Sequence, residues 1–138
     1  MIDNLPPSPC WLSWDKVQSF TGADFELAWT SLQSPSKSFR MSRIDAYVNE
    51  ASSGQKIHPT QKPVALYRWL LHNYAKPGDK ILDTHLGSGS IAIACHEKGF
   101  DLTGSELDPD YFAAMQKRLG EAFAQTSIFD VVRGLTSD

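Results

Sequence analysis

The second half of the chain alternates short apolar runs with segments in which apolar residues recur at helical spacing. Residues 64–74 place an apolar side chain every three or four positions, which predicts a helix with one buried side. A short apolar run at 81–83 predicts a buried strand, and a helical pattern at 91–95, a strand at 102–105 and a helix at 109–119 follow. Strands alternating with helices predict parallel pairing, so the fold class is α/β with a doubly wound sheet.

Cap and turn residues support these boundaries. Thr60 is predicted to cap the first helix, with Pro63 in its first turn. The run Lys76-Pro77-Gly78-Asp79 predicts a type II turn, in which proline sets one central residue and glycine takes positive φ at the other. Gly99 is expected to end the second helix, and Asp108-Pro109 to begin the third.

The first half has weaker signals. Residues 10–14 and 25–30 are predicted strands. Residues 33–55 are rich in serine and show little periodicity, which indicates a long loop or a strand pair with an open loop. Arg40 and Arg43 could touch phosphates there, and solvated loop charges are an equally good interpretation.

The chain is expected to form a single domain over residues 1–138. Its parts are a strand region of the sheet (1–32), a variable loop (33–56), a region of alternating helices and strands (57–124) and a tail (125–138). The tail is predicted to fray after Ala124, apart from the apolar pair Ile128-Phe129.

Composition excludes several classes of protein. The net charge of −3 argues against a dedicated nucleic-acid binder, although it allows a local basic patch. Two cysteines make no disulfide framework, and the four histidines lack the spacing of a metal site. The N-terminal residues lack the pattern of a signal peptide, and no apolar run approaches a membrane span, so a cytoplasmic location is expected.

The candidate site is the segment Asp83-Thr84-His85-Leu86-Gly87-Ser88-Gly89-Ser90. Ligands of open parallel sheets bind beyond the carboxyl ends of the strands, and Asp83 and Glu106 both lie at such ends. Glycines after the first strand let a ligand approach the backbone, and the following helix N-terminus favours an anionic group. Glu106 follows Asp83 at about the 20-residue spacing described for nucleotide-binding βαβ units, where an acidic residue binds ribose hydroxyls.

This spacing alone does not separate S-adenosylmethionine (SAM) from NAD. The dinucleotide pattern requires a third glycine, and Ile91-Ala92 occupies that region, which disfavours NAD.

The motifs also resemble a known family. His58-Pro59-Thr60-Gln61-Lys62-Pro63, then residues 83–90, then Ser105-Glu106-Leu107-Asp108 are similar to the DNA adenine-N6/cytosine-N4 methyltransferases in their permuted, β-class motif order. The similarity covers about 57–119, and residues 5–32 resemble the preceding segment of phage and prophage methylases.

The resemblance implies a partial SAM-dependent methyltransferase fold of the Rossmann-like type, with SAM as cofactor and DNA as partner. It makes 57–124 the SAM-binding region and gives the variable loop 33–56 a possible DNA contact. In that family Thr60, Gln61 and Lys62 would line the methionine end of SAM, and Glu106 would hold the ribose. The methionine and sulfonium region would be wrapped by Asp83, Leu86, Gly87, Ser88 and Gly89. For His58 a structural role is at least as good an interpretation as ligand contact.

Two departures from the family pattern stand out. His85 replaces the usual aromatic residue before the glycine loop, which puts the SAM affinity in doubt; a catalytic base here is the less favoured interpretation. The catalytic Asp/Asn/Ser-Pro-Pro-Tyr/Phe motif, whose aromatic ring stacks on the flipped base, is not found. The nearest sequence, Asn4-Leu5-Pro6-Pro7-Ser8, has an inserted leucine and no aromatic residue. No catalytic residue is therefore assigned.

We expect a SAM-binding part of a DNA amino-methyltransferase, phage-like and not competent alone. The alternative is a non-catalytic SAM-binding or regulatory module that associates with itself or with a partner chain. Gln125-Thr126-Ser127-Ile128-Phe129 resembles a sliding-clamp-binding peptide, but a frayed tail is the favoured interpretation.

Overall fold

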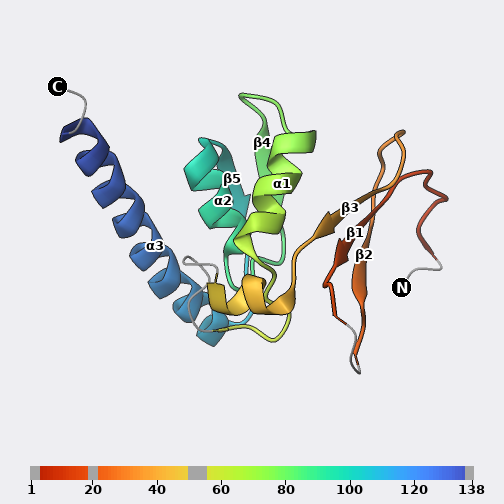
Figure 1. Ribbon diagram of the computed structural model, residues 1–138, viewed down its shortest axis with the longest axis horizontal. Coiled ribbons are helices and arrows are strands. Elements are labelled where there is room, and N and C mark those ends of the chain that lie inside the picture. Colours follow the sequence, from red (N-terminus) through yellow and green to blue (C-terminus); the bar gives the residue numbers. More distant parts are fainter. Residues whose placement is uncertain (1–3, 19–21, 50–55, 136–138) are drawn as a thin grey trace. The chain divides into compact units, whose positions relative to one another are not determined.

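The structure is a computed structural model that describes residues 4–18, 22–49 and 56–135. Its contacts divide the chain into two compact units, Met1–Asp45 and Ala46–Asp138, which we call unit 1 and unit 2 (Figure 1). The single domain expected from the sequence stays a prediction.

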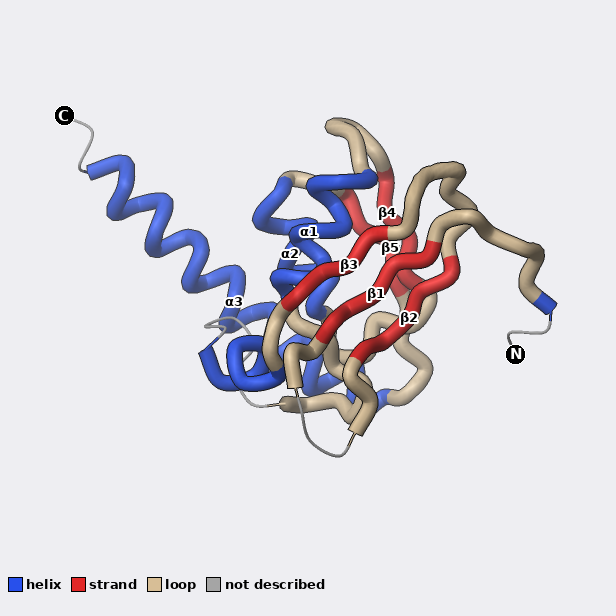
Figure 2. Tube along the Cα trace, turned by 45° about the vertical axis from the view of Figure 1, so that its right-hand side comes forward, coloured by secondary structure: helices blue, strands red, loops and turns tan. Residues whose placement is uncertain are grey.

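Unit 1 holds a three-stranded sheet in the order β2-β1-β3 (Figure 2). Strand β1 (Trp11–Asp15) pairs antiparallel with β2 (Phe25–Trp29) and parallel with β3 (Lys37–Arg40). The strands predicted at 10–14 and 25–30 are confirmed.

The interpretation of 33–55 as a loop or strand pair is wrong in two places. Strand β3 pairs with distant β1, and a π-helix, η2, covers Asp45–Asn49. Strand β3 shows no clear alternation because Phe39 is its only large apolar residue. Arg40 Nε donates to Asp15 Oδ2 at 2.9 Å, so this guanidinium is held by a carboxylate of the neighbouring strand.

Unit 2 contains the alternating pattern predicted from the sequence. Its elements are α1 (Val64–Tyr74), β4 (Lys80–Asp83), α2 (Ser90–Lys98), β5 (Asp101–Gly104) and α3 (Pro109–Leu135). Strands β4 and β5 pair in parallel, from Lys80 opposite Asp101 to Asp83 opposite Gly104. The α/β class and the parallel pairing are confirmed.

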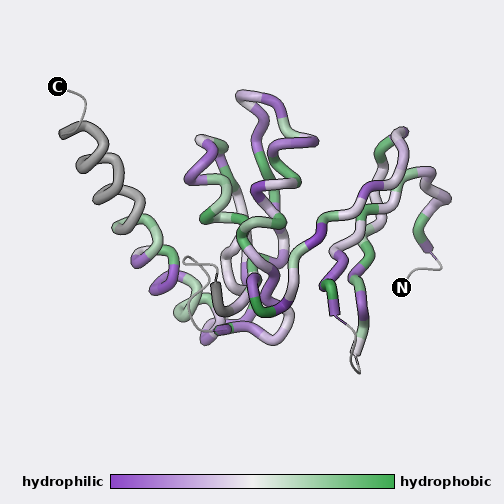
Figure 3. The backbone as a smooth tube through the Cα atoms, in the orientation of Figure 1, coloured by the Kyte–Doolittle hydropathy of each residue, from purple (hydrophilic) through white to green (hydrophobic). Residues whose placement is uncertain are grey.

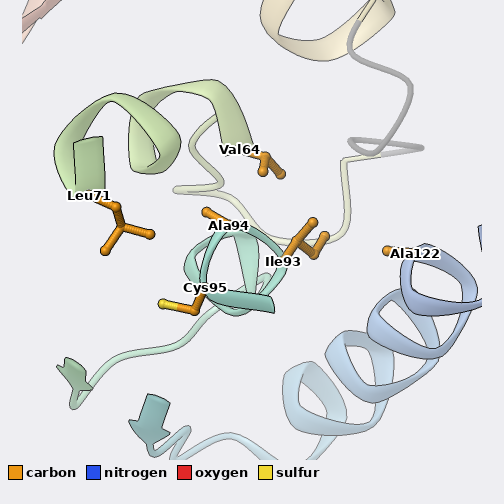
Figure 4. Close-up of a cluster of buried hydrophobic side chains, with 6 residues drawn as sticks. All are labelled: Val64, Leu71, Ile93, Ala94, Cys95 and Ala122. Carbon is orange, nitrogen blue, oxygen red and sulfur yellow. The ribbon is translucent and has the colours of Figure 1, made fainter. Parts of the chain in front are cut away.

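The core of unit 2 lies between its helices. Figure 4 shows Ile93, Ala94 and Cys95 of α2 between the α1 side chains and Ala122 of α3. The six buried residues are Val64, Leu71, Ile93, Ala94, Cys95 and Ala122. Helices α1 and α2 carry both hydrophilic and hydrophobic residues, as expected for helices that bury one face (Figure 3).

Several local predictions are confirmed. Gly78 has φ 89° and Asp79 N donates to the Lys76 carbonyl at 3.0 Å, as a type II turn requires. Gly99 ends α2 in the left-handed conformation, at φ 72°. Asp108 Oδ1 accepts hydrogen bonds from the N–H groups of residues 110 and 111, which caps α3.

Other local predictions are wrong. The residue that caps α1 is Pro63, in an extended conformation and with no side-chain bond, rather than Thr60. Strand β4 is not buried, because Leu82 is 70% exposed. Phe112 falls within the pattern that predicted the helix at 109–119, but this apolar side chain is exposed.

The expected fraying after Ala124 is also wrong, because α3 continues to Leu135. Adding residues to an existing helix costs far less than starting one, and no proline interrupts this segment. The possible clamp-binding peptide, residues 125–129, therefore lies within a helix.

Candidate functional site

The loops that follow β4 and β5 run side by side. Ser105 N donates to the Asp83 carbonyl at 3.0 Å, and Leu86 N donates to the Ser105 carbonyl at 2.9 Å. The parallel pairing thus continues past the strands and brings Asp83 and the Glu106 region to the same edge, where open parallel sheets bind ligands.

The glycine loop is a tight turn into α2. Gly89 N donates to the Leu86 carbonyl at 2.8 Å, and Gly87 and Gly89 have φ values of 52° and 72°. A Cβ on Gly89 would lie 2.6 Å from Met115 Cγ, so α3 leaves no room for a side chain there. Both glycines are required by backbone conformation, and Gly89 also by the close approach of α3.

Glu106 binds the loop directly. Its Oε2 accepts a hydrogen bond from Gly87 N at 2.7 Å, and its Oε1 accepts one from Asp108 N at 3.0 Å. The N–H groups of Asp108 and Gly87 lower the pKa of Glu106, so the group is a carboxylate at neutral pH. A carboxylate has about four acceptor sites, and the N–H groups of Asp108, Gly87 and Leu107 do not use all of them.

His58 packs against Gly87 of the glycine loop. A Cβ on Gly87 would lie 3.5 Å from His58 Nδ1, and the His58 ring meets the Tyr111 ring edge-on at 4.4 Å. The Thr60 hydroxyl lies 3.0 Å from the same His58 nitrogen. The structure therefore gives His58 a packing role beside the candidate site.

Gln61 and Lys62 reach this region in different ways. Gln61 is buried, and its Oε1 accepts a hydrogen bond from Ile57 N at 3.0 Å, while its carbonyl accepts one from the Tyr47 hydroxyl at 2.5 Å. The Lys62 carbonyl accepts a hydrogen bond from Ser90 Oγ at 2.7 Å. Gln61 thus holds its own segment in shape, and the backbone of Lys62 joins that segment to the start of α2.

Asp83 and His85 form a small turn before the glycines. Asp83 Oδ1 accepts a hydrogen bond from His85 N at 2.9 Å, and the His85 ring lies 2.9 Å from the hydroxyl of Thr84. Asp83 also raises the pKa of the Cys95 thiol, as a smaller cause after burial. The imidazole of His85 is exposed.

Leu86 is held over the end of β5. A Cβ on Gly104 would lie 2.7 Å from Leu86 Cδ2, so the missing side chain of Gly104 makes room for the leucine. The structure therefore brings together Leu86, the glycine loop, Glu106 and the segment from His58 to Lys62.

The sequence analysis missed Arg118. This arginine lies on α3, is buried, and donates from Nη1 to the Ser88 carbonyl at 2.8 Å and to Ser90 Oγ at 3.0 Å. One signal was present: Arg118 follows Met115 and precedes Ala122 at helical spacing, so it interrupts the buried stripe of the helix.

An open depression of about 310 Å³ is lined by Lys56, Ile57, His58 and Pro59. Its volume is at the lower end for a small-molecule site. Among residues 4–18, 22–49 and 56–135, no group of His, Cys, Asp and Glu side chains is arranged to hold a metal ion. In the same ranges no helix combines the length and the apolar character needed to cross a membrane.

Comparison with known proteins identifies the family. A family model described as DNA methylase, for N6 and N4 methyltransferases, matches residues 12–117. Type II methyltransferase M.HpaI of Haemophilus parainfluenzae is 31% identical over 78 residues, which are 56% of this chain and 25% of the relative. "Putative methylase YubD" of Escherichia coli (strain K12) is 39% identical over 67 residues, 49% of this chain and 30% of the relative.

A solved structure shares the fold. The crystal structure of the M1.HpyAVI-SAM complex matches with a TM-score of 0.57 and 20% identity, over 79% of this chain and 60% of that one. The matches cover only 25% and 30% of the length of the two curated relatives. The family model nevertheless spans most of the chain, from the first strand of unit 1 into α3. This chain therefore belongs to the DNA N6/N4 methyltransferase family.

Proposed function

We propose that unit 2 binds SAM at the edge formed by the ends of β4 and β5. The observation that carries this proposal is the Glu106 carboxylate, which is bound to the Gly87 amide and keeps acceptor capacity for a hydroxyl donor. A ribose offers two such hydroxyls. The glycine loop and the N-terminus of α2 beside it suit the carboxylate of the methionine moiety.

The other predicted site residues are proposed to bind SAM around Glu106 and the glycine loop. Asp83 lies where a carboxylate can meet the amino group of methionine, and Leu86, Ser88 and Gly89 shape the wall of the site. Thr60 and Lys62 line the methionine end, while Gln61 acts through the segment that it holds. Bound SAM supplies an electrophilic methyl group on its sulfonium; the residues of this chain bind and orient it.

We propose that the whole protein transfers this methyl group to adenine N6 or cytosine N4 of DNA. The family match and the M.HpaI relative, named a type II methyltransferase, support the reaction. The segment 33–56, which includes β3 and η2, is the proposed DNA contact. Since the 138 residues contain no Asp/Asn/Ser-Pro-Pro-Tyr/Phe sequence, we propose that this chain holds the methyl donor and does not transfer it alone.

Isothermal titration calorimetry of the purified chain with SAM tests the binding step. We expect saturable binding of SAM and of S-adenosylhomocysteine, with no competition by NAD. A chain that shows no heat of binding at millimolar SAM would contradict the proposed site. Tritiated SAM with DNA tests the second step: we expect no label in DNA from this chain alone, and methyl transfer would refute that part.

A second candidate function is favoured by exposed apolar side chains in β4 and in the segment after β5. Leu82 is 70% exposed and Leu107 is 98% exposed. Apolar side chains at this edge are consistent with a non-catalytic SAM-binding module that associates with itself or a partner chain. Sedimentation velocity distinguishes this self-associating module from the methyl-donor part of a DNA methyltransferase. A SAM-binding chain that stays monomeric at high concentration would count against self-association.

A further inference from the structure

We propose that Arg118 is a positioning residue for the methyl-donor site, because its hydrogen bonds hold the glycine loop against the Lys62 segment. The inference rests on the SAM site proposed above and deepens it. Arg118 lies in α3, 30 positions after Ser88 along the chain, and is 7% exposed. It acts through the backbone of the loop and is not expected to touch the cofactor.

The first step of the argument is the peptide that joins Ser88 to Gly89. Its carbonyl accepts the 2.8 Å hydrogen bond from Arg118 Nη1, and its N–H donates to the Leu86 carbonyl at 2.8 Å. The peptide group is planar, so hydrogen bonds at both ends fix its orientation. Glu106 holds the preceding Gly87 N–H in the same way. The loop therefore depends on two side chains from outside it, Glu106 and Arg118.

The second step is the link across the site. The nitrogen of Arg118 that binds the Ser88 carbonyl also donates to Ser90 Oγ at 3.0 Å. Ser90 Oγ in turn donates to the Lys62 carbonyl at 2.7 Å, and the Ser88 and Ser90 hydroxyls lie 3.2 Å apart. One buried guanidinium nitrogen thus connects α3, the glycine loop and the Lys62 segment, two of which are proposed walls of the SAM site.

The third step is the chemistry of the donor. Hydrogen bonds from a charged group are stronger than those between neutral groups. Removing the donor leaves the Ser88 carbonyl and the Ser90 hydroxyl in a buried place without that partner, which favours rearrangement of the loop. Small displacements of a binding loop are sufficient to weaken a site that depends on geometry.

The test measures SAM affinity in Arg118→Met and Arg118→Lys, with Arg68→Met as the matched control. Methionine removes both hydrogen bonds, and we expect the dissociation constant to rise roughly tenfold or more. Lysine can donate both bonds from one nitrogen but is one bond shorter, so we expect partial rescue. Arg68 of α1 forms an ion pair with Glu97 of α2, with 2.6 Å between Nε and Oε2. Removing this ion pair should leave SAM affinity unchanged.

Ser90→Ala keeps the proposal testable if Arg118 variants fold poorly. It removes the link to the Lys62 carbonyl and retains the bond from Arg118 to the Ser88 carbonyl. We expect weaker SAM binding, and non-additive losses when Ser90→Ala is combined with Arg118→Met, because both act through one network. Additive losses, or a Ser90→Ala variant with wild-type affinity, would overturn the coupling.

Amide hydrogen exchange separates this inference from the proposed function, because it requires no cofactor. In Arg118→Met we expect the Gly89 amide to exchange faster, with the amides of α1 unchanged. If the wild-type chain fails to bind SAM, the proposed function fails, and exchange still decides whether Arg118 holds the loop. If the wild type binds SAM and Arg118→Met binds it equally well, the inference about Arg118 fails alone.

Discussion

Gly89 and Gly99 flank α2 and share one backbone conformation, with φ 72° at both. Their surroundings differ. A Cβ on Gly89 would meet Met115 Cγ at 2.6 Å, whereas one on Gly99 would have nothing within 4 Å. The pair therefore separates the cost of a left-handed conformation from the cost of a steric clash.

We expect Gly99→Ala to lower the free energy of unfolding by about 1 kcal/mol, the cost of left-handed backbone for an L-residue. Gly89→Ala should cost this amount and about 1–3 kcal/mol more, because Met115 and the loop must move apart. Urea denaturation measures both values. Equal costs would show that α3 yields to the added methyl group without strain.

Glu106 provides a residue-level prediction about pH. Its pKa is lowered by the N–H groups of Asp108 and Gly87, so the carboxylate stabilises the folded loop. A lowered pKa means that this stabilisation is complete above the ordinary pKa of 4.5 and is lost as the pH falls through the lowered value. The loop should therefore loosen only in acid.

The Gly87 amide proton reports this titration by NMR. We expect its chemical shift to change with a midpoint below 4.5, and the change to disappear in Glu106→Gln. The Gly99 amide, which donates to carbonyls of α2, is the internal control and should lack this transition. A Gly87 midpoint at or above 4.5 would contradict the proposed hydrogen bond to ionised Glu106.

At the scale of elements, α2 is the centre of unit 2. It packs between α1 and α3, and it begins at the glycine loop, so its burial also holds the candidate site in place (Figure 4). Ile93 is 1% exposed in this packing. Its side chain is the largest fully buried one among the described residues.

Ile93→Ala should reduce the free energy of unfolding by about 2–4 kcal/mol, since buried methylene and methyl groups are lost and a cavity remains. Ile44→Ala removes the same atoms from a side chain that is 67% exposed and should change stability by less than about 0.5 kcal/mol. Chemical denaturation compares the two. Similar losses would mean that the core is not where the structure places it.

At the scale of the whole molecule, each unit carries one buried cysteine. Cys10 in unit 1 is 0% exposed and Cys95 in unit 2 is 1% exposed. Burial, and then Asp83, raise the pKa of Cys95, so little thiolate forms at neutral pH. The two thiols can therefore report separately on the opening of the two units.

We expect both cysteines to react slowly with a thiol reagent in the native protein and quickly in urea. Mass spectrometry of the labelled peptides distinguishes them. If residues 1–138 form one cooperative domain, as the sequence predicts, both become reactive at the same urea concentration. Two separate midpoints would show that the units unfold independently and would contradict the single domain.

The sequence by itself determined what depends on neighbouring residues. The turn at 76–79, the end of α2 at Gly99 and the start of α3 at Asp108-Pro109 are confirmed, because caps and dihedral requirements act over a few positions. The alternation of helices and strands in unit 2 was predictable for the same reason. So was the glycine loop, since positive φ after a strand selects glycine.

Only the tertiary structure decided what depends on residues far apart. Strand β3 needs β1 as its partner, Leu82 is exposed although it is apolar, and Gly87 lies between Glu106 and His58. Arg118 is the clearest case. Its place between Met115 and Ala122 at helical spacing indicates burial, but only the packing of α3 against the loop decides that its guanidinium binds the Ser88 carbonyl. Side-chain partners are chosen by packing in space, which sequence spacing does not encode.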